Sequence, residues 1–284
     1  MRFNYLEPTT IGEAISLLVK YDGKAKVIAG GTDVFVQVKN KTLKPEYLVD
    51  ITGIPGLDYI DYDEKHGLRI GALTTVRAIE KSDKLRQMYP VLCQAAELLG
   101  SVAIRNVATI GGNLCNAVPS ADNAPSLIGL SARAKIVGPG GERVVPLQDF
   151  FIGTGKTVLK TGELLVEIQV PVPPSGTKGV YLKYMRSAVD LAVVGVAVII
   201  TLDGEVCKDV KIVIGAVAPT PMRAKKAEEV IRDKRIDDAL IDKCAQTAAD
   251  EAHPRPGSIR ASPEYKKEII KLFITQAIKE AMAK

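Results

Sequence analysis

Two short glycine-rich segments of the chain carry residue types that suit the binding of an anion. They are AGGTD, residues 29–33, and TIGGN, residues 109–113. A glycine pair lets successive backbone N–H groups point to one side and lets an anion come close, so two such segments brought together can hold a pyrophosphate. Polar side chains in the segments can add hydrogen bonds. These side chains are Thr32, Asp33, Thr109 and Asn113.

Each of these features also has a structural interpretation. A single glycine pair is typical of a tight turn or a β-bulge. Asp122, in PSADNAP, is also a residue type that caps a helix before the apolar PSLIGL, and Lys183, in YLKYMRS, fits a strand residue that faces solvent. Neither glycine segment has the G-x-G-x-x-G spacing or the P-loop lysine, which disfavours a Rossmann dinucleotide fold and an NTPase.

Metal binding and acid–base catalysis have little support in the sequence. The four cysteines lie far apart and form no C-x-x-C pair, which argues against a zinc site or a cysteine-ligated cluster in this chain. We expect them to be reduced thiols in a cytoplasmic protein. His66 and His253 lie beside Gly67 and Pro254 in expected turns, without a candidate ligand or nucleophile nearby. We therefore expect neither a metal site nor a catalytic side chain.

Composition favours a folded globular protein. Of 284 residues, 46% are hydrophobic and 25% are charged, and the net charge of +5 includes no long block of one sign, so we expect no nucleic-acid partner. Glu7, Pro8 and Glu13 interrupt the N-terminus, which does not follow the pattern of an export signal. The longest apolar run, residues 191–200, is half of the roughly 20 residues that cross a bilayer.

The elements expected around the glycine segments alternate between strands and helices. Pro and Gly crowd together in PVPPSGTKG, residues 171–179, which is the best candidate for a linker between two domains. Strands followed by helices after this point predict an α+β second domain.

Along the whole chain, helices are expected over residues 10–19, 76–85, 90–100 and the C-terminus. Hairpin turns are expected at residues 138–141 and 203–204.

Longer motifs carry a specific resemblance. IGALTT, IRNVATIGGNLCNAVPSADNAP, GELLVEIQVP, YLKYMRSAVDLAVVGVA, GAVAPTPMRAKKAE and RASPEYKKE follow AGGTD in order along nearly the whole chain. In these motifs the chain resembles the medium, flavin-binding subunit of the molybdenum hydroxylases, the family of carbon monoxide dehydrogenase and xanthine dehydrogenase. The resemblance implies a two-lobed FAD-binding domain of the vanillyl-alcohol oxidase (PCMH) type, with a small α+β C-terminal domain. The expected boundaries are 1–174, with lobes 1–56 and 57–174, and 175–284.

The resemblance also implies the residues that bind FAD. Asp122 matches an aspartate on the ribose and adenosine side, Leu165 an apolar residue against the flavin, and Lys183 a lysine near the isoalloxazine ring. A cation there would stabilise the anionic reduced flavin. The first glycine segment lacks the histidine or cysteine that attaches flavin covalently in some relatives of this fold, so we expect noncovalent FAD. The pyrophosphate is expected at Ala29, Gly30, Gly31, Thr32 and Asp33 in one lobe and at Thr109, Gly111, Gly112 and Asn113 in the other.

On this resemblance the chain is an electron-transfer subunit of an oxidoreductase. Substrate hydroxylation would occur on a large molybdopterin subunit, and electrons would pass through [2Fe–2S] clusters on a small subunit to FAD and then to NAD, a quinone, a carrier protein or oxygen. The assembly would be a heterotrimer or a dimer of heterotrimers. Two alternatives are a free-standing FAD-dependent oxidase of the vanillyl-alcohol oxidase type, which usually needs a larger substrate domain, and a scaffold subunit that has lost its flavin.

Overall fold

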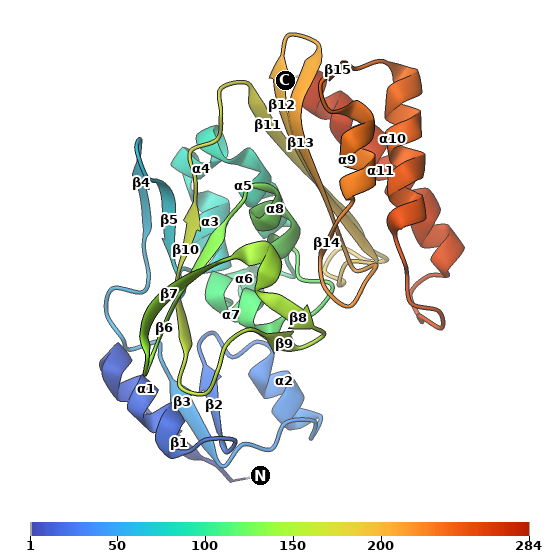
Figure 1. The fold of residues 1–284 in the computed structure, drawn as a ribbon. Helices are drawn as coiled ribbons and strands as arrows, with labels where there is room; N and C mark the ends of the chain where they lie inside the picture. The colour runs from blue at the N-terminus through green and yellow to red at the C-terminus, as the bar shows by residue number, and fades with distance from the viewer. Residues whose placement is uncertain (1, 284) are drawn as a thin grey trace.

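The computed structural model describes residues 2–283, and successive stretches of the chain form successive layers (Figure 1). The N-terminal layer is a parallel sheet with strand order β1-β3-β2. Helix α1 (Ile11–Lys20) packs on it and begins within one residue of the prediction, because the Thr10 hydroxyl accepts a hydrogen bond from the Glu13 N–H at 3.1 Å. The other elements of this layer are β1 (Asn4–Leu6), β2 (Ala25–Ile28), α2 (Val34–Lys39) and β3 (Tyr47–Asp50).

The second layer is an antiparallel sheet with strand order β4-β5-β10-β6-β7. Its β6–β7 hairpin turns where the sequence predicted, with Gly138 opposite Gly141. Strand β10 lies in the middle of the sheet, and a register shift between Leu165 and Glu167 marks a bulge. The elements are β4 (Ile60–Asp63), β5 (Gly67–Gly71), β6 (Arg133–Gly138), β7 (Gly141–Pro146), the 3-10 helix η1 (Leu147–Asp149), the paired β8 (Phe151–Gly153) and β9 (Lys156–Thr157), and β10 (Leu164–Val170).

The chain between β5 and β6 is helical and differs from the prediction at two points. The helix expected over residues 76–85 is two helices, because Ser82 has an extended conformation and its hydroxyl caps the second helix at the Leu85 N–H. The second glycine segment, expected as a loop, begins a helix that Thr109 caps. The helices are α3 (Val76–Lys81), α4 (Asp83–Met88), α5 (Pro90–Glu97), α6 (Val102–Arg105), α7 (Ile110–Asn116) and α8 (Asn123–Gly129).

The C-terminal part is an antiparallel sheet with helices on one face, as the order of its elements predicted (Figure 1). Its long hairpin turns at Asp203 and Gly204, as expected. In α11, the apolar residues at helical spacing face the core: Ile270, Ile274 and Ala277 are fully buried, and Phe273 is partly buried against the same core. The elements are β11 (Thr177–Tyr184), β12 (Val194–Asp203), β13 (Val206–Gly215), β14 (Met222–Arg223), α9 (Lys225–Ile231), β15 (Lys234–Arg235), α10 (Asp238–Glu251) and α11 (Pro263–Ala283).

The other face of this sheet packs directly on α5 and α8 of the preceding part (Figure 1). Glycines allow the close approach: a Cβ at Gly129 would lie 2.5 Å from Ile199, and a Cβ at Gly179 would lie 2.9 Å from Val91. The stretch 171–179 is shorter as a connection than expected, because residues 177–179 already pair with β12. Across the described residues 2–283, no helix is long and apolar enough to cross a membrane.

Candidate functional site

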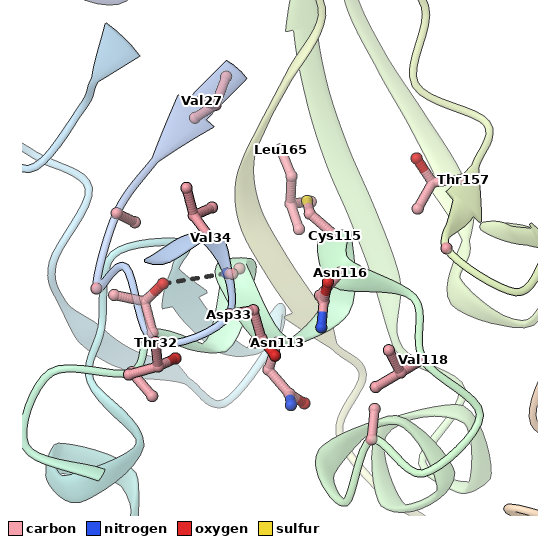
Figure 2. Close-up of a pocket in the computed structure, with 18 of the residues that line it drawn as sticks. Val27, Thr32, Asp33, Val34, Asn113, Cys115, Asn116, Val118, Thr157 and Leu165 are labelled. Carbon is pink, nitrogen blue, oxygen red and sulfur yellow. Dashed lines mark hydrogen bonds between the residues drawn. The ribbon is translucent and has the colours of Figure 1, made fainter. Parts of the chain in front are cut away.

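The two glycine segments meet at a cavity of about 820 Å³. This volume lies within the range of roughly 300–1,000 Å³ that is usual for small-molecule and cofactor sites. Figure 2 shows part of its wall, with Val27 on β2, Thr32 and Asp33 after it, Asn113 on α7 and Leu165 on β10. The cavity is therefore built by the N-terminal layer, the antiparallel sheet and the helical stretch between β5 and β6, and residues 183 and 189–191 of the C-terminal part complete it.

The first glycine segment offers unused main-chain donors to the cavity. Among the described residues, no hydrogen bond to the protein occupies the N–H groups of residues 30–33, all of which line the cavity. Gly31 has φ +71°, the left-handed conformation that glycine tolerates best. Gly30 lies so close to the neighbouring chain that a Cβ would be 1.8 Å from the Val107 carbonyl oxygen. The segment thus has the fixed, close-approaching backbone that anion binding requires.

The second glycine segment differs from the expectation, because the main-chain donors of residues 110–113 are already used within the protein. The Gly111 N–H donates to the Ala72 carbonyl at 2.9 Å, the Gly112 N–H to the Thr109 hydroxyl at 3.1 Å, and the Asn113 N–H to the Thr109 carbonyl at 3.0 Å. Gly111 is required by packing, since a Cβ there would lie 2.6 Å from the Ala72 oxygen. The glycines of this segment leave room for a ligand to approach the backbone, and the Asn113 side-chain amide can form a hydrogen bond with it.

A buried polar network joins the helical part to the C-terminal sheet at the cavity. Lys183 Nζ lies 2.9 Å from Asp122 Oδ2 and 2.8 Å from the Leu98 carbonyl oxygen. The Tyr181 hydroxyl donates to Asp122 Oδ1 at 2.9 Å. The Lys183 and Asp122 side chains are only 1% and 5% exposed. Burial raises the pKa of the Asp122 carboxyl, and the Lys183 charge and the Tyr181 hydrogen bond oppose this rise.

The network corrects two interpretations of the sequence. Lys183 does not face solvent, and Asp122 precedes α8 without making a side-chain capping bond. The pairing brings Asp122 and Lys183, both expected to bind FAD, to one position in the cavity wall. Their contact depends on two segments 61 residues apart being docked together, which local sequence patterns do not encode.

Several cavity residues have no signal in the sequence. Leu99 and Gly100 form part of the wall, as do Cys115 and Asn116 on α7. The Asn116 amide oxygen accepts a hydrogen bond from Gln37 Nε2 at 3.2 Å. Burial raises the pKa of the Cys115 thiol to about 12, so it is protonated at neutral pH and is a weak nucleophile. Only their place in the folded chain identifies these residues.

Within residues 2–283, no cluster of three or more histidine, cysteine or acidic side chains has the arrangement of a metal site. His66 lies in an exposed turn, where Nδ1 is 2.7 Å from Asp63. The polar groups of the cavity are main-chain donors, amides, hydroxyls and charged side chains, among them Asp33 and the Asp122–Lys183 pair, and such a set suits the holding of an organic ligand.

Family models match both parts of the chain. Residues 1–173 match the FAD binding domain in molybdopterin dehydrogenase, and residues 179–281 match the CO dehydrogenase flavoprotein C-terminal domain. In sequence, the chain is 34% identical over 282 residues to the xanthine dehydrogenase FAD-binding subunit of Escherichia coli O157:H7, covering 99% of this chain and 96% of the relative. It is 34% identical over 283 residues to the carbon monoxide dehydrogenase medium chain of Afipia carboxidovorans, covering 99% and 97%.

Solved structures share the whole fold. A chain of carbon monoxide dehydrogenase from Hydrogenophaga pseudoflava, in a form that lacks the Mo-pyranopterin moiety of the molybdenum cofactor, superposes with a TM-score of 0.96 at 32% identity, covering 100% of this chain and 98% of that one. A chain of quinoline 2-oxidoreductase from Pseudomonas putida 86 superposes with a TM-score of 0.93 at 27% identity, with the same coverage. The similarity therefore extends over both parts of the molecule.

Proposed function

The chain belongs to the FAD-binding medium subunits of the molybdenum hydroxylases, and we propose that its cavity holds one noncovalent FAD through which electrons pass between partner subunits and an external acceptor. The family and the α+β flavoprotein fold confirm the resemblance noted in the sequence. The chain is thus the flavoprotein subunit of an oxidoreductase.

The observation that carries the cavity assignment is the set of unused N–H groups at residues 30–33. Main-chain donors in a glycine-rich turn bind phosphate oxygens well, and the cavity is large enough for a cofactor. The pyrophosphate would lie against residues 29–33, and the glycines of residues 109–113 would let it approach from the opposite side. FAD would supply the redox chemistry, since it can exchange one or two electrons.

The Asp122–Lys183 pair adds electrostatics at its end of the cavity. We propose that Lys183 lies near the isoalloxazine ring and that Asp122, its ion-pair partner, lies on the ribose and adenosine side. Lys183 already donates to a carboxylate and a carbonyl. These two acceptors largely balance the charge of Lys183. Its main effect on the flavin would therefore be a hydrogen bond to the ring, and its effect on the flavin potential would be smaller. Leu165, buried on β10, would contribute apolar contact.

Noncovalent binding is supported by the side chains of the cavity. The first glycine segment contains neither histidine nor cysteine. Cys115 does line the cavity, but burial raises its thiol pKa to about 12 and keeps it protonated. Acid precipitation should therefore release the flavin.

Membership of the family supports partner subunits for this chain. We propose a small subunit with [2Fe–2S] clusters and a large molybdopterin subunit, in a cytoplasmic heterotrimer or dimer of heterotrimers. Exposed apolar side chains support a protein partner beside the first glycine segment, since Val107, whose carbonyl lies against Gly30, is 49% exposed, and Val102 on α6 is 47% exposed.

A ligand series on the unmodified apoprotein tests the cavity assignment. FAD, FMN and riboflavin share the ring, but only FAD has the pyrophosphate. Affinity should fall from FAD to FMN to riboflavin, and ADP-ribose, which carries the pyrophosphate without the ring, should compete with FAD. Equal affinity for FAD and riboflavin would contradict a pyrophosphate site at residues 30–33.

A further inference from the structure

Part of the cavity wall is held by buried cations from two directions. Residues 98–100 follow α5, and Leu99 and Gly100 line the cavity. The carbonyls of all three residues accept hydrogen bonds from cationic side chains. Arg105 Nη1 lies 3.0 Å from both the Leu99 and Gly100 oxygens, and Lys183 Nζ lies 2.8 Å from the Leu98 oxygen.

Arg105 is itself fixed by a carboxylate behind the wall. Arg105 Nε lies 2.7 Å from Glu80 Oε2, and Arg77 Nη1 lies 2.5 Å from Glu80 Oε1. The Glu80 and Arg105 side chains are 7% and 9% exposed. Burial has the largest single effect on the Glu80 carboxyl and raises its pKa, but the bonds from Arg77 and Arg105 together outweigh it and lower the pKa. Glu80 is thus a charged anchor on α3.

Neither Glu80 nor Arg105 lines the cavity, so they can act on a ligand only through the wall. The planar guanidinium of Arg105 donates to a carboxylate and two carbonyls in one fixed geometry, which a flexible ammonium cannot reproduce. The backbone it fixes is unusual, since Gly100 has φ +49°. Loss of Glu80 would leave Arg105 buried without its counter-charge and free to leave the two carbonyls.

We propose that Glu80 and Arg105 are positioning residues that set the wall at residues 98–100 against which the Lys183 end of the bound flavin rests. This inference depends on the proposed FAD function, and it assigns a role in that site to an ion pair outside the cavity. A purely structural pair would change the stability of the fold and leave the flavin environment unaltered.

The chain offers a matched control for this distinction. Glu228 on α9 is likewise buried and bound by arginines, with Arg223 Nε 3.0 Å from Oε1 and a side-chain exposure of 2%, but it lies outside the cavity. Glu228→Gln therefore removes the same kind of charge at a distance from the flavin. The experiment compares Glu80→Gln, Arg105→Lys and Glu228→Gln as full chains with bound FAD.

Three quantities are measured for each variant: the unfolding midpoint, the FAD dissociation constant, and the visible circular dichroism of the flavin. Glu80→Gln and Arg105→Lys should raise the dissociation constant about tenfold or more and change the flavin dichroism. Glu228→Gln should lower the unfolding midpoint without either flavin change. Wild-type dissociation constants and spectra in folded Glu80→Gln and Arg105→Lys would overturn the inference.

Should neither variant fold, Gly100→Ala decides the question with the ion pair intact. A Cβ at Gly100 would lie 3.3 Å from Ile104 in a backbone conformation that alanine disfavours, so either the Ile104 side chain or the backbone of the wall must adjust. A changed flavin dichroism supports the positioning role of the wall, and an unchanged one overturns it. Failure of the wild-type chain to bind FAD at all would instead refute the proposed function.

Discussion

Lys183 and Asp122 form a buried ion pair of 2.9 Å between the C-terminal sheet and the segment that precedes α8. Both side chains also line the cavity. The cavity wall is therefore complete only when the two parts of the chain are packed together. FAD binding and this contact between the two parts of the chain should therefore stabilise each other.

Breaking the pair should be costly. Asp122→Asn leaves a buried ammonium without its counter-charge, a kind of change that usually costs about 3–5 kcal/mol. Denaturant unfolding measures the loss. The double variant Asp122→Leu with Lys183→Met should be less destabilised than the sum of the single changes.

The exposed pair of Lys24 and Glu46, at 3.4 Å, is the control for that experiment. Glu46→Gln should cost about 0–1 kcal/mol, because solvent screens an exposed pair. A loss no larger for Asp122→Asn than for Glu46→Gln would contradict a structural role for the buried pair.

Gly31→Ala should weaken FAD binding. The left-handed backbone at φ +71° disfavours a Cβ by about 1–2 kcal/mol, and a Cβ would also lie 2.8 Å from the Phe35 ring. Relief of that strain moves the unused N–H groups. Titration of the apoprotein with FAD measures the effect.

Gly204→Ala provides the comparison, since Gly204 has φ +59° in a hairpin with open space around it. Gly204→Ala should introduce a similar backbone strain and so lower the free energy of unfolding, but it should leave the FAD dissociation constant unchanged. Equal FAD affinity in the two variants would argue against a role for the first glycine segment.

Acid should destabilise the fold partly through Glu80. Its pKa is lowered in the folded chain from an ordinary value of 4.5, so the unfolded chain binds more protons at this group. Its stabilising contribution is present above that ordinary value and is lost as pH falls through the lower folded-state pKa. Unfolding curves between pH 3 and 6 (roughly the titration range of carboxyl groups) should show a weaker pH dependence for Glu80→Gln than for the wild type. An identical dependence would contradict the lowered pKa.

Much of the local structure was predictable, because its signals are local. Thr10 caps α1, and the turns at Gly138–Gly141 and Asp203–Gly204 join their strands as expected. The glycine segments were identified as a candidate site by residue type alone. The difference between the two segments was not predictable. The second segment begins a helix at residue 110, which Thr109 caps, but its two glycines have low helix propensity and so argue against predicting a helix there.

Contacts between distant segments could not be predicted from patterns. Nothing in YLKYMRS indicates that Lys183 is buried against Asp122, since the contact requires β11 to pack on α5 and α8. Glu80 and Arg105 similarly look like ordinary charges of surface helices, and only the fold shows that they hold residues 98–100. Tertiary docking decides the function of such residues.

The most direct test of the central claim is the flavin content of the purified chain. The absorbance spectrum is recorded before and after acid precipitation, and the released flavin is quantified against protein. The account predicts a yellow protein that releases about one FAD per chain into the acid supernatant, in line with a single noncovalent site. A colourless chain that fails to bind added FAD, or a flavin that stays with the precipitate, would contradict it.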